Sequence, residues 1–212
     1  MSEISIETRQ TYDLISETYA RVNATPDERI RADAAGLAAD LGPGCLVADV
    51  GCGPGREVEL LRAHGVRVVG FDLSLGQLRA GGVAGVAQAD MRRLPVRSGS
   101  LDGVWCQAAL LHIPRAEVPA VLAEFARIVR IGGALHLNVS EGDGEGWEMA
   151  ANYGSDRRRW FTLHRLPDLT RLLAEAGFVV RRSGRNRARR DWLRVYAHRA
   201  DTRTPVADSA LG

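Results

Sequence analysis

The feature that most constrains this fold is a glycine-rich turn between a short apolar run and a helical pattern. Residues 47–56 read Val-Ala-Asp-Val-Gly-Cys-Gly-Pro-Gly-Arg, with glycines at Gly51, Gly53 and Gly55, and a helical apolar pattern begins at Val58. The pattern predicts a buried strand, a tight turn and a helix. Glycines let the backbone approach a ligand closely, and the free N–H groups that open a helix attract an anion.

The spacing of the glycines separates two kinds of nucleotide site. A dinucleotide fingerprint, G-x-G-x-x-G, does not fit this loop, and Asp49 stands two residues before the first glycine. The resulting D-x-G-x-G-x-G pattern resembles the first motif of class I S-adenosylmethionine-dependent methyltransferases, especially the small-molecule members called type 11. Taken alone, the pattern also suits a plain strand–turn–helix connection. The resemblance implies that the cofactor contacts Asp49, Gly51, Cys52, Gly53 and Gly55.

Two further acids follow the next two predicted strands. Asp72 ends an apolar run, and Asp90 follows a weaker one. A carboxylate accepts two hydrogen bonds from a cis-diol such as that of ribose. The resemblance implies that Asp72 holds the ribose, that Leu73 packs on adenine, and that Asp90 and Met91 bind the adenine edge. The plain alternatives are a helix-capping role for Asp72 and a turn role for Asp90.

The fourth motif runs from residue 100 to residue 114 and places Gln107 at the end of a strand, where the family faces cofactor and substrate. His112 follows, and its ordinary pKa near neutrality suits a general base. The same Leu-His-Ile-Pro sequence recurs in the family with differing substrates, which favours a structural histidine instead. Tyr19 is the second catalytic candidate, on an N-terminal helix expected over the cofactor. Tyr12 and Tyr19 also suit simple helix packing.

Strand and helix patterns alternate along the chain, which predicts an α/β fold: a Rossmann-like, doubly wound, seven-stranded sheet. The family resemblance implies a mostly parallel sheet with one antiparallel C-terminal strand. We expect a single domain over residues 1–200, with a helical cap over 1–41, a core over 45–198 and a disordered tail over 201–212. A helix is expected to start at the Thr25-Pro26 cap, and another to stop at the Gly132-Gly133 pair. The strands are expected over 46–50, 66–71, 83–89, the centre of 100–114 with Gln107 at its end, 134–139, 178–180 and 192–197.

A glycine-interleaved acidic stretch follows the fifth strand, over residues 140–147. Loops at this edge of an open α/β sheet form the ligand crevice. We therefore expect a loop that serves as substrate wall and lid, with Trp147, Tyr153 and Trp160 as substrate residues. Its acids lack the spacing of a calcium loop, so no metal is expected.

Composition narrows the remaining alternatives. The net charge is +2, all 28 basic residues are arginine, and the three cysteines lack metal-ligand spacing. Without an apolar N-terminal signal, we expect a cytoplasmic protein. Residues 151–200 hold 13 arginines against four acids, a patch that suits either solvated surface or a phosphate backbone.

The motifs together predict an enzyme that transfers a methyl group from S-adenosyl-L-methionine to an oxygen, nitrogen or carbon atom of a small molecule, leaving S-adenosyl-L-homocysteine. A nicotinamide-dependent reductase is disfavoured by the glycine spacing and by the absence of any lysine for a Tyr-x-x-x-Lys pair. Two alternatives stay open: an RNA methyltransferase that uses the arginine patch, and a non-catalytic protein that binds the cofactor. We expect a monomer or homodimer with no membrane partner, and nucleic acid is the less favoured partner.

Overall fold

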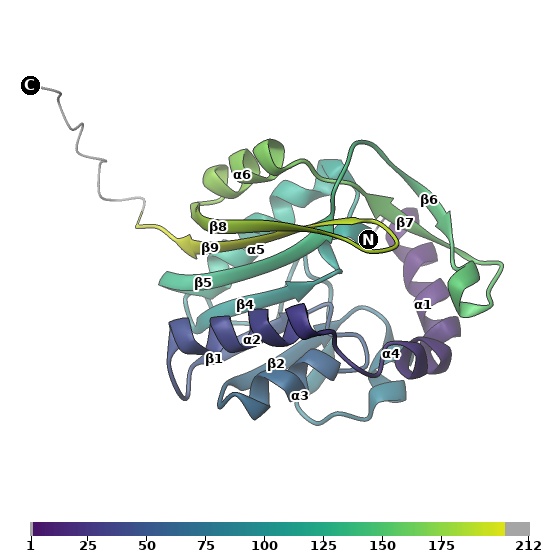
Figure 1. Cartoon of the computed structure of the whole chain (residues 1–212), viewed down its shortest axis with the longest axis horizontal. Helices are drawn as coiled ribbons and strands as arrows, with labels where there is room; N and C mark the ends of the chain where they lie inside the picture. Colours follow the sequence, from purple (N-terminus) through teal and green to yellow (C-terminus); the bar gives the residue numbers. More distant parts are fainter. Residues whose placement is uncertain (1, 202–212) are drawn as a thin grey trace, which may run out of the picture.

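The computed structural model describes residues 2–201, so the predicted tail lies outside the described residues except for Asp201. A seven-stranded sheet crosses the molecule with helices on both faces (Figure 1). Its strand order is β3-β2-β1-β4-β5-β9-β8. The strands of this sheet are β1 (Leu46–Val50), β2 (Arg67–Asp72), β3 (Val86–Gln88), β4 (Leu101–Gln107), β5 (Val129–Ser140), β8 (Phe178–Arg187) and β9 (Asp191–Arg199).

The pairing of the strands confirms the expected doubly wound, mostly parallel sheet. Strands β3, β2, β1, β4 and β5 pair in parallel, whereas β9 is antiparallel to both β5 and β8. The chain winds outward from β1 to β3 and then returns to place β4 on the other side of β1. Ligands in such folds bind beyond the carboxyl ends of the strands, at this switch point.

The two faces of the sheet carry separate apolar cores. One core joins the sheet to α2 (Glu28–Leu41), α3 (Arg56–Ala63) and α4 (Leu75–Gly81). The other, larger core joins it to α5 (Val118–Ile128) and α6 (Leu166–Glu175). Strand β4 shows how one strand serves both cores, because Val104 and Cys106 belong to the second core and Trp105 to the first. Burial on both faces explains the apolar run Val104-Trp105-Cys106 at its centre.

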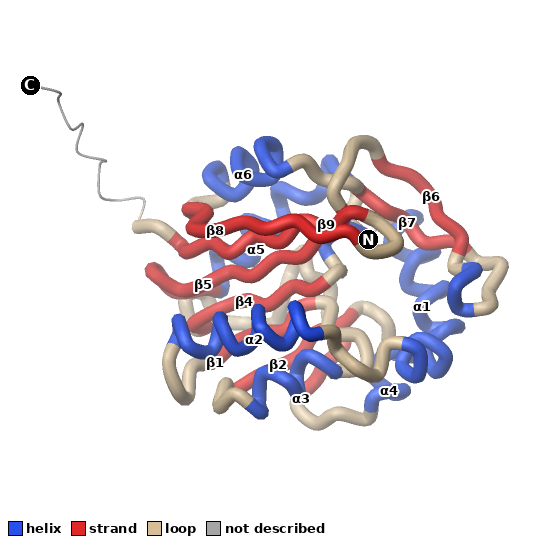
Figure 2. Tube along the Cα trace, viewed as in Figure 1, coloured by secondary structure: helices blue, strands red, loops and turns tan. Residues whose placement is uncertain are grey.

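A separate layer covers the carboxyl ends of the strands. Helix α1 (Glu3–Val22) is continuous, and it packs against a two-stranded antiparallel hairpin of β6 (Glu145–Met149) and β7 (Arg158–Thr162). Figure 2 shows this helix and hairpin grouped beside the main sheet. The prediction of a loop over residues 140–147 is therefore wrong for its second half. Alternating side chains stabilise a hairpin there, with Trp147 opposite Trp160 across the ladder.

Two predicted boundaries are also wrong. The cap of α2 is Asp27, whose side chain accepts a hydrogen bond from the Ile30 amide at 2.8 Å, so the expected Thr25-Pro26 start lies before the helix. Helix α5 ends at Ile128, and Gly132-Gly133 lies inside β5 rather than at a helix end. The ladder between β4 and β5 skips residues 130–133, so the glycines form a bulge in the strand.

Short 3-10 turns complete the described chain. They are η1 (Leu110–His112), η2 (Arg115–Glu117) and η3 (Ala151–Tyr153). Across residues 2–201, no helix combines the length and the apolar character that crossing a bilayer requires.

Candidate functional site

The glycine turn after β1 is held by backbone hydrogen bonds to the end of β2. The amides of Gly51 and Cys52 donate to the Phe71 carbonyl at 2.7 and 3.1 Å. Gly51 has a φ of +77°. A Cβ atom added there would lie 2.1 Å from the Cβ of Ala109, so only glycine fits this position. The turn is therefore pressed against the segment that follows β4.

Asp72 lies beside this turn, at the carboxyl end of β2. Its two carboxylate oxygens accept from the backbone amides of Gly53 at 2.8 Å and Ser74 at 2.7 Å. Burial raises the pKa of Asp72 to about 6, although these hydrogen bonds act in the opposite direction. A buried carboxylate is thus fixed in orientation between the glycine turn and α4, where its remaining lone pairs can accept donors from a ligand.

A first cavity opens at the carboxyl ends of the strands. It brings together most of the residues that the sequence predicts for cofactor binding, together with both catalytic candidates. The predicted residues that line it are Tyr19, Gly51, Gly53, Asp72, Leu73, Asp90, Met91, Gln107 and His112.

Three predicted cofactor residues lie elsewhere. Asp49 is 1% exposed beneath the turn, and burial, followed by the charges of Glu57 and Asp72, raises its pKa well above the usual range. Cys52 is buried and lines a neighbouring cavity. Gly55 packs near Val83, away from the first cavity. These three residues shape the turn from behind.

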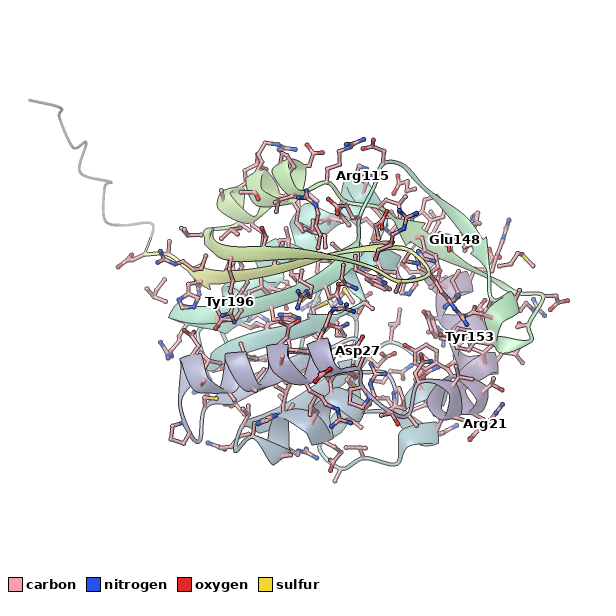
Figure 3. All side chains as sticks on the ribbon, viewed as in Figure 1. Arg21, Asp27, Arg115, Glu148, Tyr153 and Tyr196 are labelled. Atoms are coloured by element: carbon pink, nitrogen blue, oxygen red, sulfur yellow. The ribbon has the colours of Figure 1, made fainter. Side chains whose placement is uncertain are left out.

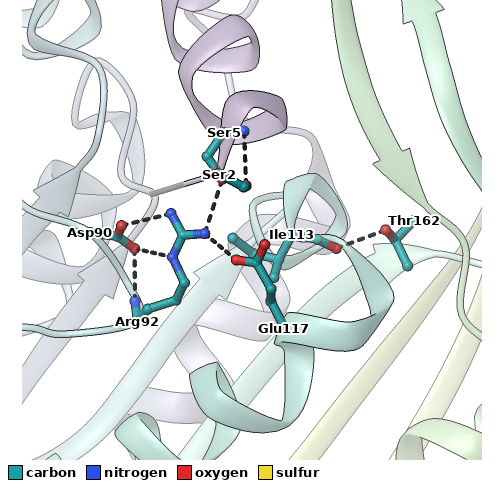
Figure 4. A network of polar contacts seen from close by, with 7 residues as sticks. All are labelled: Ser2, Ser5, Asp90, Arg92, Ile113, Glu117 and Thr162. Atoms are coloured by element: carbon teal, nitrogen blue, oxygen red, sulfur yellow. Dashed lines mark hydrogen bonds and ion pairs between the residues drawn. The ribbon is translucent and has the colours of Figure 1, made fainter.

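Arg92, which the sequence analysis did not single out, organises the far wall of the first cavity. Its guanidinium donates two hydrogen bonds to the Asp90 carboxylate, at 2.8 and 2.7 Å. It also donates to the Ser5 hydroxyl of α1 at 3.0 Å and forms an ion pair with Glu117 (Figure 4). Burial acts to raise the pKa of Asp90, but the Arg92 hydrogen bonds outweigh it and lower that pKa. No motif marks Arg92, because its partners come from three separate segments.

His112 lines the cavity, and both of its ring nitrogens are engaged. Its Nδ1 lies 2.6 Å from the Trp160 carbonyl, and its Nε2 lies 2.7 Å from the Tyr12 hydroxyl. Since a carbonyl only accepts, Nδ1 carries the proton and Nε2 accepts from Tyr12. Burial lowers the pKa of His112 to about 3, so the ring is neutral. The arrangement favours the structural alternative over the general base.

Tyr19 continues an aromatic wall over the glycine turn. Its ring centroid lies 5.6 Å from that of Tyr12 and 5.2 Å from that of Tyr153. Figure 3 shows Tyr153 beside α1, and its hydroxyl accepts from the Asn23 side chain at 3.2 Å. Burial raises the pKa of Tyr19 well above its usual value, so this phenol keeps its proton.

A second, larger cavity adjoins the first and shares part of its lining. Tyr153 lines it, but Trp147 and Trp160 do not; their rings pack edge to face on the hairpin, 5.3 Å apart. Arg159 and Phe161 face it instead, because alternate side chains of β7 point to opposite sides. The residues shared by the two cavities are Tyr12, Tyr19, Gly51, Gly53, Gln107, Ala108 and His112.

About half of the arginine patch of residues 151–200 is paired with acids: among the described residues, seven of its 13 arginines form ion pairs, five with acids outside the patch and two with acids inside it. Several of its members form ion pairs: Arg158 with Glu7, Arg165 with Asp143, Arg171 with Glu175, Arg185 with Glu141, Arg187 with Asp191, Arg190 with Glu148 and Arg194 with Asp33. Paired surface arginines are less free to contact a phosphate backbone.

Comparison with known proteins adds a family match over the segment that holds this site. Residues 48–137 match the family model described as "Methyltransferase domain". Among curated relatives, demethylmenaquinone methyltransferase of Thermobifida fusca is 33% identical over 134 residues, 58% of this chain and 54% of the relative. Malonyl-[acyl-carrier protein] O-methyltransferase of Laribacter hongkongensis is 37% identical over 106 residues, 42% of this chain and 35% of the relative. The chain thus spans about half the length, or less, of these relatives.

Solved structures match over nearly the whole chain. Magnesium protoporphyrin IX methyltransferase of Synechocystis, solved with bound S-adenosylmethionine, superposes with a TM-score of 0.73 at 20% identity, covering 94% of this chain and 98% of that one. The 1,6-didemethyltoxoflavin-N1-methyltransferase of Burkholderia thailandensis has a TM-score of 0.68 at 23% identity, covering 95% and 92%. At these identities the likeness establishes the fold.

Proposed function

We propose that this chain, which belongs to the class I S-adenosylmethionine-dependent methyltransferase family, binds S-adenosylmethionine in the first cavity and transfers its methyl group to a small molecule in the second. One observation carries the proposal. The glycine turn, the Asp72 carboxylate and the Asp90-Met91 segment line a single cavity at the switch point between β1 and β4. That is where an open α/β sheet binds a nucleotide.

The residues of the first cavity fit the cofactor. A Cβ atom at Gly53 would point toward Gln77 and Tyr19, so its absence leaves room for a ligand against the turn. We assign the ribose hydroxyls to Asp72 and one face of the adenine to Leu73. We assign binding of the adenine edge to Asp90 and to the backbone amide of Met91.

The backbone of the glycine turn, together with Gln107 at the end of β4, is assigned to the methionine end of the cofactor. The buried Oε1 of Gln107 has no hydrogen-bond partner among the described residues, so it is free to accept from a ligand. Asp49 supports the turn from behind, and Cys52 and Gly55 shape it without facing the first cavity.

The first cavity would hold S-adenosylmethionine, whose positively charged sulfur would supply an activated methyl group to the acceptor atom, with the electron pair of the broken C–S bond remaining on sulfur. The protein mainly has to align the two centres and exclude water. Tyr12, Tyr19 and His112 line the boundary between the cavities, where they would enclose the reacting atoms. His112, neutral and doubly hydrogen-bonded, holds Tyr12 in place rather than removing a proton.

The substrate residues follow from the second cavity. Tyr153 and Phe161 are assigned to the acceptor, whereas Trp147 and Trp160 stabilise the hairpin that carries them. The ion pairs of the arginine patch disfavour the RNA alternative. The three buried cysteines, Cys45, Cys52 and Cys106, are free thiols, which supports a reducing cytoplasmic location. We propose a monomer or homodimer.

The test uses S-adenosylmethionine with a deuterated methyl group and panels of small acceptors and RNA, with release of S-adenosylhomocysteine measured by mass spectrometry. We expect labelled product from small acceptors, and none from Asp72→Ala. Glu175→Ala, which removes an exposed carboxylate of α6 that pairs with Arg171, is the matched control and should keep full activity. Labelled RNA alone would favour the RNA alternative, and cofactor binding without turnover would favour a non-catalytic role.

A further inference from the structure

A buried arginine without an acidic partner lies in the second cavity. Arg159 is 6% exposed. Its Nη1 donates to the Tyr12 hydroxyl at 3.1 Å and its Nη2 to the Asn152 side-chain oxygen at 3.3 Å, while its Nε has no partner. Within residues 2–201, no carboxylate lies within ion-pair distance of Arg159. Its side chain therefore makes two long hydrogen bonds to neutral groups, and no carboxylate balances its positive charge.

Other arginines that line the same cavity have acidic partners. Three partly buried ones each hold a carboxylate: Arg56 with Glu57, Arg190 with Glu148 and Arg194 with Asp33. Burying a charge is unfavourable unless an opposite charge and hydrogen bonds compensate it. Arg159 is the buried cation of this cavity, among the described residues, that lacks such compensation. The missing anion is best supplied by a ligand.

Aromatic rings fix the position of this guanidinium. The Cζ atom of Arg159 lies 5.4 Å from the ring centroid of Tyr12, 5.2 Å from that of Tyr153 and 5.3 Å from that of Phe161. Cation–π contacts of this kind hold the side chain in place but carry no net negative charge. A preorganised guanidinium favours planar oxygen anions, to which it donates two parallel hydrogen bonds.

From these contacts we infer that Arg159 binds an anionic oxygen group of the methyl acceptor, so that the substrates of this protein are small organic acids bearing a carboxylate or an ionised hydroxyl. The inference rests on the proposed function, since it takes the second cavity as the acceptor site. Arg159 lines that cavity and not the first, which holds Asp72 and Met91.

A polar group of β5 adds a second recognition element. The side-chain oxygen of Asn138 is buried without a partner among the described residues, and this residue lines the second cavity but not the first. Such an oxygen accepts hydrogen bonds. An acid that also carries an O–H or N–H donor therefore matches both Arg159 and Asn138.

The carboxylate of the cofactor is a second source of the same chemistry, and the first arm of the test separates the two. Calorimetry measures S-adenosylhomocysteine and 5′-methylthioadenosine, which lacks the amino-acid tail, binding to wild type and Arg159→Met. We expect both affinities to stay within about twofold of wild type. A loss of more than about tenfold for S-adenosylhomocysteine alone would assign Arg159 to the cofactor and overturn the inference.

The second arm titrates matched acids and amides into protein saturated with S-adenosylhomocysteine, followed by NMR: benzoate against benzamide, and indole-3-acetate against indole-3-acetamide. We expect wild type to prefer the acid by about tenfold or more, since charge-assisted hydrogen bonds are the stronger kind. Arg159→Met should lose this preference. The control Arg158→Met removes the adjacent arginine of β7, which is exposed and paired with Glu7, and should keep the preference.

Equal binding of acid and amide by wild type, no binding of any acid, or a preference that survives in Arg159→Met would overturn the inference. The comparison of acid with amide in wild type needs no variant, so it can overturn the inference even where Arg159→Met fails to fold. Failure of the proposed function is distinguishable: without a cofactor site, wild type would not bind S-adenosylhomocysteine itself, and without transfer to small molecules, the deuterated-methyl assay would give no labelled small product.

Discussion

Replacing His112 by glutamine should flatten the acid sensitivity of this fold. The folded protein keeps the ring neutral, with a pKa of about 3, through burial and despite the Trp160 carbonyl, which acts in the opposite direction. In the unfolded chain a histidine has a pKa of about 6.5. Below that value the histidine side chain binds a proton in the unfolded state, whereas the buried ring of the folded state stays neutral. Stability from the neutral ring is therefore present above about pH 6.5 and is lost as the pH falls toward about pH 3.

The magnitude follows from these two values. Between about pH 7 and pH 5, the unfolded state gains nearly one proton at this site while the folded state gains almost none, which removes about 2 kcal/mol of stability. Glutamine preserves an acceptor for the Tyr12 hydroxyl and a donor for the Trp160 carbonyl, but it does not titrate in this range. The difference between wild type and His112→Gln isolates one site, since Asp49 and Asp72 are unchanged.

The assay is urea unfolding of both proteins at several pH values across this window, with the slope of free energy against urea checked for constancy. We expect the stability gap between wild type and His112→Gln to shift by about 2 kcal/mol in favour of the variant as the pH falls from about 7 to 5. Parallel loss of stability in the two proteins would refute the placement of His112 as a buried neutral ring.

Three further predictions concern the packing of the fold. Gly51→Ala should destabilise the fold by about 3 kcal/mol or more, because its Cβ would overlap Ala109, whereas Gly44→Ala, at a φ of +74° with open space around it, should lose only about 1 kcal/mol in the same unfolding assay. Phe125→Ala empties a fully buried position of the larger core, so its midpoint in urea should fall by the equivalent of about 3–5 kcal/mol. Ala108→Gly relieves a non-glycine φ of +52° at the end of β4 and should be neutral or stabilising by up to about 1 kcal/mol, as thermal unfolding would reveal.

The main sheet was predictable because its evidence is local in sequence. Apolar runs mark the strands, amphipathic patterns mark the helices between them, and polar residues fall where strands end. Those positions meet at one edge of a parallel sheet, which is why Asp72, Met91 and Gln107 reach a common cavity. The family resemblance added the direction of the last strand.

The covering layer was harder to predict. Whether Trp147 or Phe161 faces the cavity depends on the register of a short hairpin, and a one-residue shift exchanges the two sides of a strand. The acidic, glycine-rich stretch before β6 conceals that hairpin. The sequence did not mark Arg159 either. Arg158 and Arg159 are adjacent arginines in the same basic stretch, and only the alternation of side chains along β7 makes Arg158 exposed and Arg159 buried.

The role of His112 was left open for a related reason. A histidine that precedes a helix after the fourth strand suits a base, and the decisive facts are its two partners, Tyr12 and Trp160. Both lie far from it in sequence, and one contributes only a backbone carbonyl. The residue type of His112 does not indicate which distant groups its ring nitrogens contact.

The most direct test of the account is a calorimetric titration of S-adenosylhomocysteine into wild type and Gly53→Ala. We expect wild type to bind in the micromolar range, about −8 kcal/mol. Gly53→Ala adds a methyl group toward the cavity without a close contact in the free protein; its φ of +53° should cost only about 1 kcal/mol of stability, so the variant should fold and yet bind weakly. Wild type that fails to bind S-adenosylhomocysteine, or Gly53→Ala that binds it as tightly as wild type, would contradict the placement of the cofactor against the glycine turn.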